Sequence, residues 1–353
     1  MRRVESERSG DGCVRRGWTV SGWMLAGVML AVLGPSKAVA QSCTTQAKMN
    51  ALLRSSLADA AMSLATDVKN ASVAKLKSEA IDEYASSFTA ASSLIENTAG
   101  QISGDTLQVT QIYVLDARNR KSADQGDADF SCPLTGSSSE TDFSIAGLPP
   151  GMYAFVMVEA TGAKPWLVSM LLRQETGHWK LAGLYPHART AAGEGGLWYW
   201  KKARYAAKAN QLWYAWLLYA EADELLRPSN FTTSTDLDKL QSEQRSATPS
   251  ELADGISENH PLLIKGADGT QYRVTSLGSE GSEDGKRVNV VMHYTGDVLA
   301  AAVAQEMAKN ASAAAALVDA HKELRQGFDG VIVVADVQGR APFVTEQKMN
   351  EIH

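Results

Sequence analysis

Residues 171–186, LLRQETGHWKLAGLYP, decide the fold class of this 353-residue chain. The tripeptide Glu175-Thr176-Gly177 is a turn signal, and apolar residues dominate the segments on both sides of it, at 166–173 and 179–185. Two apolar runs joined by a short glycine-containing turn are typical of a β-hairpin. We therefore predict two adjacent antiparallel strands here.

Further strands are predicted upstream of this hairpin. Residues 106–116 (TLQVTQIYVLD) alternate between apolar and polar side chains, and residues 152–160 form a long apolar run. Residues 143–145 lead into the turn Leu148-Pro149-Pro150-Gly151. Alternation and turn residues at these spacings predict an antiparallel sheet.

Two amphipathic helices are predicted before the strands. Apolar residues recur at three-and-four spacing over residues 49–64 and again over residues 73–91, and Asn70-Ala71-Ser72 between them offers a helix cap. Two helices followed by a curved antiparallel sheet resemble the nuclear transport factor two-like fold, a cystatin-like α+β cone, over residues 45–186. We expect these helices to present their apolar faces to the sheet.

A second resemblance leaves the architecture of this region open. Residues 143–158, FSIAGLPPGMYAFVMV, also resemble the hairpin of prealbumin-like β-sandwich modules. We favour the cone because two helices precede the strands. The resemblance to a cone implies an apolar pocket that can house an acid–base residue, for which Tyr113 and Glu159 are the strand candidates.

The most distinctive segment is WYWKKARYAAKANQLWYAWLLYAEADELLRP, residues 198–228, which holds four of the eight tryptophans. A tetratricopeptide hairpin carries small or aromatic side chains at certain positions. At the corresponding positions this chain has Ala203, Ala215, Tyr219 and Ala222. Residues 197–228 therefore resemble a tetratricopeptide-like helical hairpin. One hairpin cannot bury its own faces, so we expect it to pack on a neighbouring domain or on a partner.

The aromatic side chains of this hairpin have two interpretations. They either fill the contact with the neighbouring domains or form a platform for an envelope protein or a glycan. For the platform, we expect Trp198, Trp200 and Tyr214 to be exposed. His187 lies at the junction between sheet and hairpin and is the one histidine to which we assign a candidate binding role.

The remainder of the chain is predicted to hold a linker and a small α+β sandwich. Residues 229–259 are polar, with a short helix near Leu237. After them we expect antiparallel strands, a long helix from Asp297 to Arg325 and a final strand at 330–335. The predicted divisions are a signal segment (1–40), a helix-plus-sheet domain (41–190), the aromatic hairpin (191–228), the linker (229–259) and a C-terminal α+β unit (260–353).

Residues 1–40 have the three parts of an export signal. Five arginines precede an apolar run at residues 23–33, and Ala38-Val39-Ala40 supplies small residues for a signal peptidase. The run is shorter than the roughly 20 residues that span a bilayer. Arg15-Arg16 resembles a twin-arginine motif, but the residues after Trp18 depart from it, so we favour ordinary Sec export to the bacterial periplasm or exterior.

Two cysteines remain after the signal segment, Cys43 and Cys132. An even number of cysteines in an exported protein predicts a disulfide bond. Two cysteines this far apart in sequence do not form a metal-binding motif, and no cofactor site is predicted. Removal of a segment with six basic and three acidic residues changes the net charge from −6 to −9. Such an acidic chain lacks the electrostatic footprint of a nucleic-acid-binding protein.

The functional expectation follows from these absences and from the aromatic hairpin. We find no nucleophile elbow, zinc-protease motif, phosphate-binding loop or second apolar stretch long enough to span a membrane in the sequence. The arrangement resembles that of secreted bacterial proteins, which implies no known activity. We expect a non-enzymatic binding or scaffolding protein of the cell envelope. The alternative is a small-molecule enzyme or ligand carrier that uses the pocket of the cone.

Overall fold

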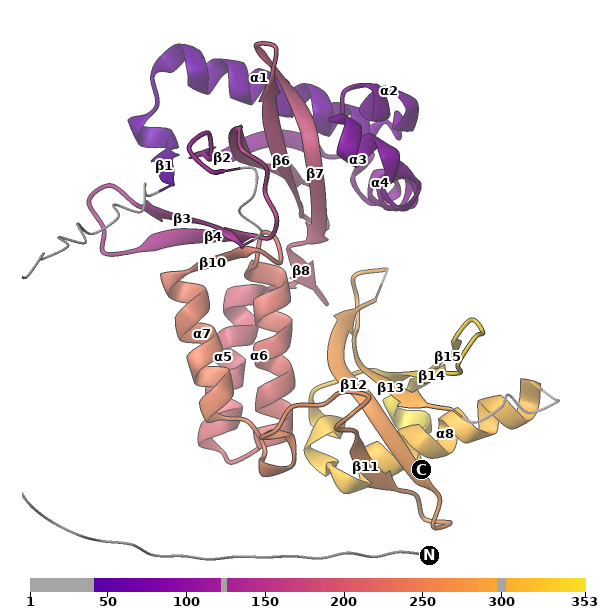
Figure 1. Cartoon of the computed structure of the whole chain (residues 1–353). Helices are drawn as coiled ribbons and strands as arrows, with labels where there is room; N and C mark the ends of the chain where they lie inside the picture. Colours follow the sequence, from indigo (N-terminus) through magenta and orange to yellow (C-terminus); the bar gives the residue numbers. More distant parts are fainter. Residues whose placement is uncertain (1–40, 122–125, 283, 297–302) are drawn as a thin grey trace, which may run out of the picture. The chain divides into compact units, whose positions relative to one another are not determined.

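The computed structural model describes residues 41–121, 126–282, 284–296 and 303–353. The predicted signal segment and Asp297, the expected first residue of the long C-terminal helix, lie outside the described residues. The fold class is α+β, as predicted. Gln41–His353 forms one compact unit that contains several antiparallel or mixed sheets and their covering helices (Figure 1).

The hairpin at residues 166–186 lies at one edge of a five-stranded sheet with the order β1-β2-β5-β6-β7, in which every pair is antiparallel. Its two-residue turn places Thr176 and Gly177 at φ angles of 48° and 86°, which is the backbone that tight hairpins favour. The strands are β1 Ser42–Thr45, β2 Thr106–Asp116, β5 Met152–Thr161, β6 Trp166–Glu175 and β7 His178–Ala188.

Four helices cover one face of this sheet (Figure 1). The first predicted helix is present, but the second, expected to be continuous from residue 73 to residue 91, is broken into three. Ile81 donates a backbone hydrogen bond to Leu181 of β7, and Leu181 donates one to Glu79, so pairing with the sheet interrupts the helix. The helices are α1 Ala51–Lys69, α2 Val73–Ser78, α3 Asp82–Ser86 and α4 Phe88–Ile102.

A three-stranded sheet with the order β10-β4-β3 covers the opposite face. Alternate residues of β2 and β5 therefore face two different apolar cores, one against the helices and one against this second sheet. The disulfide bond between Cys43 and Cys132 joins β1 to β3 and confirms the predicted pairing. The strands are β3 Ala128–Pro133, β4 Glu140–Ile145 and β10 Thr232–Ser234.

The aromatic hairpin consists of α5 Gly196–Lys208 and α6 Leu212–Leu226. Residues 229–259, expected to be a linker with a short helix near Leu237, contain β10 and a third helix, α7 Thr235–Ser246, which packs on α6. The short helix predicted near Leu237 is present, and Leu237 and Leu240 supply its buried side chains. Short elements between and around these are η1 Gln46–Lys48, β8 Thr190–Ala191, β9 Glu194–Gly195 and η2 Ser250–Leu252.

The C-terminal unit is a five-stranded sheet with the order β11-β12-β13-β14-β15. Its centre is the parallel pair β13–β14, and the helix α8 lies between these two strands in sequence. The strand β15, which pairs with β14, was not predicted. The elements are β11 Leu262–Lys265, β12 Gln271–Gly281, β13 Val288–Thr295, α8 Val303–Ala320, η3 Lys322–Gln326, β14 Gly330–Asp336, β15 Phe343–Lys348 and η4 Met349–Glu351.

The aromatic hairpin shares one apolar core with this C-terminal unit. The indole of Trp213 stacks on the imidazole of His321 with ring centroids 3.6 Å apart. The ring of Tyr214 packs edge-on against Phe328, and a Cβ atom at Gly327 would lie 1.9 Å from that tyrosine ring, so only glycine fits there. The hairpin therefore buries much of its aromatic surface within the chain.

A candidate ligand-binding cavity

The three aromatic residues expected to be exposed differ in their surroundings. Trp198 is 39% exposed, but Trp200 is 7% and Tyr214 is 5% exposed, so the expectation was wrong for the last two. Trp198 and Trp200 lie about 200° apart around a helix that turns 100° per residue, and they cannot share a face. The structure does not bring the three together into one aromatic platform.

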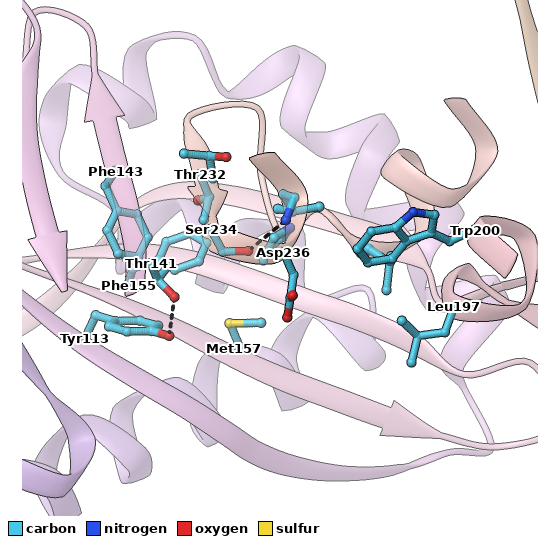
Figure 2. A pocket seen from close by; sticks show the side chains of 14 residues that line it. Tyr113, Thr141, Phe143, Phe155, Met157, Leu197, Trp200, Thr232, Ser234 and Asp236 are labelled. Atoms are coloured by element: carbon cyan, nitrogen blue, oxygen red, sulfur yellow. Dashed lines mark hydrogen bonds between the residues drawn. The ribbon is translucent and has the colours of Figure 1, made fainter. Parts of the chain in front are cut away.

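Trp200 instead forms one wall of a cavity of about 240 Å³, here called the aromatic cavity. Figure 2 shows the rings of Tyr113 and Phe143 on one side and Trp200 with Leu197 on the other, with Met157 and Asp236 between them. The lining side chains are Tyr113, Thr141, Phe143, Phe155, Met157, Leu197, Trp200, Leu226, Pro228, Thr232, Thr233, Ser234, Asp236 and Leu237.

The sheet wall of the aromatic cavity is built from interlocking rings. Tyr113 on β2, Phe143 on β4 and Phe155 on β5 meet edge to face, with centroids 5.2 Å apart in each contact. All three side chains are buried. Edge-to-face aromatic pairs have a preferred geometry and restrict one another's rotation. This wall is therefore rigid before any ligand enters.

The helix wall is held by a charged network behind Trp200. The Trp200 indole N–H donates to Glu243 of α7 at 2.8 Å. The Arg204 guanidinium lies 4.4 Å from the Trp200 ring centroid and also donates twice to Glu243, at 2.6 and 2.8 Å. These contacts orient the indole and leave its apolar surface toward the cavity.

The polar groups of the cavity are few. The Tyr113 and Thr141 hydroxyls are 3.1 Å apart and hydrogen-bonded. Burial raises the pKa of Tyr113, so its hydroxyl stays protonated at neutral pH and can donate. The Ser234 hydroxyl accepts from the Leu237 backbone N–H at 3.3 Å and is occupied as a helix cap. The exposed Asp236 carboxylate, in the first turn of α7, is the one charged group of the described lining.

This arrangement suits binding better than catalysis. Among the described lining residues there is no histidine, cysteine or lysine, so the hydroxyls have no adjacent general base other than Asp236. Apolar and aromatic lining with a few polar groups is the usual composition of a small-molecule pocket. The cavity can hold an apolar ligand that carries one hydroxyl or amino group.

The aromatic cavity does not lie inside the cone, where a pocket was expected. The space between the sheet and α1–α4 is filled by apolar side chains such as Ile112, Val156 and Met170, all almost fully buried. The aromatic cavity is on the opposite face of the sheet, where Tyr113 points. Glu159, the other strand candidate, is not among its lining residues.

His187 is separate from the aromatic cavity and lines a second, larger cavity of about 700 Å³. Burial lowers the His187 pKa to about 4, and the nearby Arg189 contributes in the same direction. The sequence did not indicate Phe143, Phe155 and Met157 at the first cavity or Glu221 at the second. Alternation along a strand indicates the face of the sheet on which each side chain lies, but not which element packs on that face.

Comparisons with models of known protein families, with curated proteins and with solved structures give no match for this chain. Within the described residues, no helix has the length and apolar character needed to cross a membrane. The described part of the chain also places no three His, Cys, Asp or Glu side chains where they could hold a metal ion. The two cavities are therefore the main basis for a functional proposal.

Proposed function

We propose that this chain is an exported, non-enzymatic binding protein that holds a small, mainly apolar molecule in the aromatic cavity. The observation that carries the proposal is the cavity itself, a space of about 240 Å³ between the rings of Tyr113, Phe143 and Phe155 and the indole of Trp200. Filling that space with apolar atoms would remove the accessible apolar lining, including Leu197, which is 60% exposed, from water at roughly 25 cal/mol per Å².

The size and polarity of the cavity define a ligand class. A dry cavity of about 150 Å³ in another protein holds one benzene molecule. The aromatic cavity is larger, so one aromatic ring with a short substituent fits its volume. Asp236 and the Tyr113 hydroxyl favour an amino or hydroxyl group on that substituent, because a carboxylate ligand would face Asp236 with like charge.

Export to the bacterial envelope is the second part of the proposal. Its supports are the signal-like residues 1–40 and the disulfide bond between Cys43 and Cys132. Disulfide bonds persist in oxidising compartments and are rare in the cytosol of most bacteria. Expression of the full chain in a bacterial host, followed by cell fractionation and N-terminal sequencing, tests this part. A chain that begins at Gln41 outside the cytosol is expected.

Calorimetric titration of Gln41–His353 with 2-phenylethylamine, 2-phenylethanol and phenylacetate tests the ligand class. We expect the amine to bind most tightly and the carboxylate least. Met157→Trp should fill the cavity and abolish binding, whereas Met307→Trp, at a position that is 54% exposed on α8, should leave binding unchanged. If none of the three compounds binds, or if Met157→Trp binds like the parent, the proposal fails.

A second candidate function is favoured by the exposed face of α5. Leu197, Trp198 and Tyr205 are 60%, 39% and 74% exposed and form an apolar and aromatic stripe beside Lys202, whose ammonium lies 4.5 Å from the Trp198 ring centroid. Such a stripe suits a glycan or a protein of the envelope. Co-sedimentation with purified cell-wall glycan tests it. Loss of co-sedimentation in a Trp198→Ala, Tyr205→Ala double variant would support this function, and no co-sedimentation of the parent would exclude the glycan.

A further inference from the structure

The second cavity, of about 700 Å³, is bordered by α4, α6, the end of β7 and β12. We call it the acidic cavity because its described lining holds four glutamates and one lysine, Lys164. These glutamates are Glu96, Glu221, Glu224 and Glu280. An excess of negative charge in a concave, partly dehydrated space attracts cations.

Glu221 is the residue that makes this cavity more than an acidic surface. Its side chain is 3% exposed, and its Oε2 atom is buried without a hydrogen-bond partner. Among the described residues, no cationic side chain forms an ion pair with it. A buried carboxylate without a cation costs several kcal/mol in solvation. The folded chain therefore bears an unfavourable solvation free energy at Glu221, in the wall of the cavity.

The position of Glu221 would suit an apolar residue. Leu217 and Leu225, one turn before and after it on α6, are buried in the apolar core. Replacement of a buried charge by an apolar residue often leaves stability unchanged or raises it. A carboxyl group kept in such a position, against stability, is characteristic of a functional site.

The groups that face Glu221 raise its affinity for a proton. Burial has the largest effect, and the negative charges of Glu224 and Glu280 act in the same direction, while the neighbouring Ser279 hydroxyl of β12, which donates to the Leu217 carbonyl at 3.2 Å, opposes them. Together they raise the pKa of Glu221 to about 7. Tyr199 of α5 is also close enough for its own pKa to be raised by Glu221, after burial.

His187, which lines the same cavity, contributes a neutral group. Its Nε2 atom is buried without a partner. Because burial and Arg189 lower the His187 pKa to about 4, its imidazole is neutral at pH 7 and can exchange hydrogen bonds with a ligand. Arg189 is directed elsewhere, since its guanidinium donates to the Leu225 carbonyl at 3.0 Å. Trp166 adds aromatic surface to the lining.

We propose that the acidic cavity binds an organic cation, an alkylammonium or guanidinium group, with Glu221 as its anionic partner. The protonated Glu221 carboxyl releases its proton to solvent, and the carboxylate then pairs with the cation, whose N–H groups donate to it. No covalent bond forms. The site suits an organic rather than a metal cation, because the described carboxylates are not gathered closely enough to coordinate one ion.

This site is separate from the aromatic cavity, with which it shares no lining residue. Binding of a cation should therefore survive Met157→Trp. The exchange of a proton for a cation also makes binding depend on pH. With one linked proton that titrates near pH 7, affinity should rise about tenfold from pH 6 to pH 8.

Calorimetric titration of the Gln41–His353 unit with 1,4-diaminobutane, and with 1,4-butanediol as the uncharged counterpart, tests the proposal. We expect the diamine to bind and the diol not to bind. Glu221→Gln should abolish binding, and Glu258→Gln, at an exposed carboxylate without a described partner, should retain it. Binding of the diamine that is equal at pH 6 and pH 8, or unchanged in Glu221→Gln, would overturn the proposal.

Proton release keeps the test decisive if Glu221→Gln does not fold. Titration of the parent at pH 7 in buffers of different ionisation enthalpy measures the protons released, and about half a proton per bound diamine is expected. Release of none overturns the proposal, as does a failure of the diamine to bind at pH 8. Calcium that binds more tightly than the diamine at equal ionic strength would show an inorganic cation site instead.

Discussion

The aromatic cavity and the acidic cavity differ in whether their buried polar groups have hydrogen-bond partners. In the first, the Tyr113 and Thr141 hydroxyls bond to each other, and the Trp200 indole N–H is satisfied by Glu243. In the second, the Glu221 carboxyl and the His187 imidazole each keep a buried atom without a partner. A cavity with satisfied walls suits an apolar ligand, and one with unsatisfied walls suits a ligand that brings the missing partner.

The two cavities should also differ in how they respond to pH. The aromatic cavity has walls of packed rings and one exposed carboxylate, so its shape should change little between pH 5 and pH 8. The acidic cavity contains two groups whose pKa values are shifted by burial, Glu221 upward and His187 downward. The following changes break or sharpen this contrast, in order of expected effect.

Loss of the disulfide bond should affect the aromatic cavity more than the acidic one. Cys132 packs in the same apolar cluster as Phe143 and Phe155, and the bond closes a loop of 89 residues. A Cys43→Ser, Cys132→Ser variant should lose about 3–5 kcal/mol of unfolding free energy, measured by urea titration. Binding of 2-phenylethylamine should weaken, while binding of 1,4-diaminobutane persists. The opposite order would contradict the placement of the two sites.

Glu221 should lower stability as the pH rises. Its pKa in the folded state is about 7, above the ordinary value of 4.5. Between these values the folded state holds a proton that the unfolded state has lost, so the unfolding free energy falls as pH increases. Relative to the parent, Glu221→Gln should gain about 2–3 kcal/mol from pH 4.5 to pH 8. Urea titrations at several pH values measure the gain, and no gain would place Glu221 in a wetter site.

His187 should raise the unfolding free energy as the pH increases, opposite to Glu221, over an overlapping pH range. Its folded pKa is about 4, below the ordinary 6.5, so the unfolded state binds the extra proton and the unfolding free energy rises with pH between these values. In the parent, the two contributions should nearly cancel between about pH 4.5 and pH 6.5. Glu221→Gln should then reveal the rising slope, and His187→Gln the falling one.

Replacement of Trp200 should test the wall of the aromatic cavity. Trp200→Phe removes the N–H that Glu243 accepts and reduces the aromatic surface beneath Arg204. We expect a loss of about 1–2 kcal/mol in unfolding free energy and weaker binding of 2-phenylethylamine. The matched control is Trp198→Phe, which should change stability by no more than about 0.5 kcal/mol because Trp198 is partly exposed. Equal effects would show that the helix wall is not ordered as described.

The smallest effect is expected at the polar group of the sheet wall. Thr141→Val keeps the shape of the side chain but removes the hydrogen bond between Thr141 and the Tyr113 hydroxyl, which leaves that hydroxyl with Gln111 alone. The cost should be about 1 kcal/mol by urea titration. A ligand that accepts a hydrogen bond from Tyr113 should recover part of it, whereas toluene, which cannot, should not. A neutral substitution would show that water or Gln111 already satisfies Tyr113.

The periodic parts of the fold could be predicted from the sequence because they depend on local spacing. The hairpin around Thr176-Gly177 and the helix α1 follow from alternation, three-and-four spacing and turn residues, whereas the α5–α6 pair was predicted from its resemblance to a tetratricopeptide-like hairpin. The break at Glu79–Ile81 could not, because a backbone bridge to Leu181 causes it and leaves no mark on the hydrophobic pattern. The helix α7 was expected near Leu237, but its packing on α6 could not be predicted, because two leucines alone supply its buried side chains.

The candidate sites were harder to predict than the fold. Trp200 and His187 were singled out by residue type, but the sequence does not indicate that they line different cavities. Asp236 and Glu221 resemble ordinary helix residues, and their roles arise from which elements meet around them. The expected exposure of Trp200 and Tyr214 failed for the same reason, since α7 and Phe328 cover them.

Methyl NMR tests the central claim most directly. With ¹³C-methyl-labelled methionine in Gln41–His353, the Met157 methyl group reports on the aromatic cavity and the exposed Met307 methyl group serves as an internal reference. We predict that 2-phenylethylamine shifts the Met157 resonance saturably, by ring-current effects, and leaves Met307 unmoved. A Met157 resonance that stays in place at saturating ligand would contradict the assignment of this cavity as the binding site.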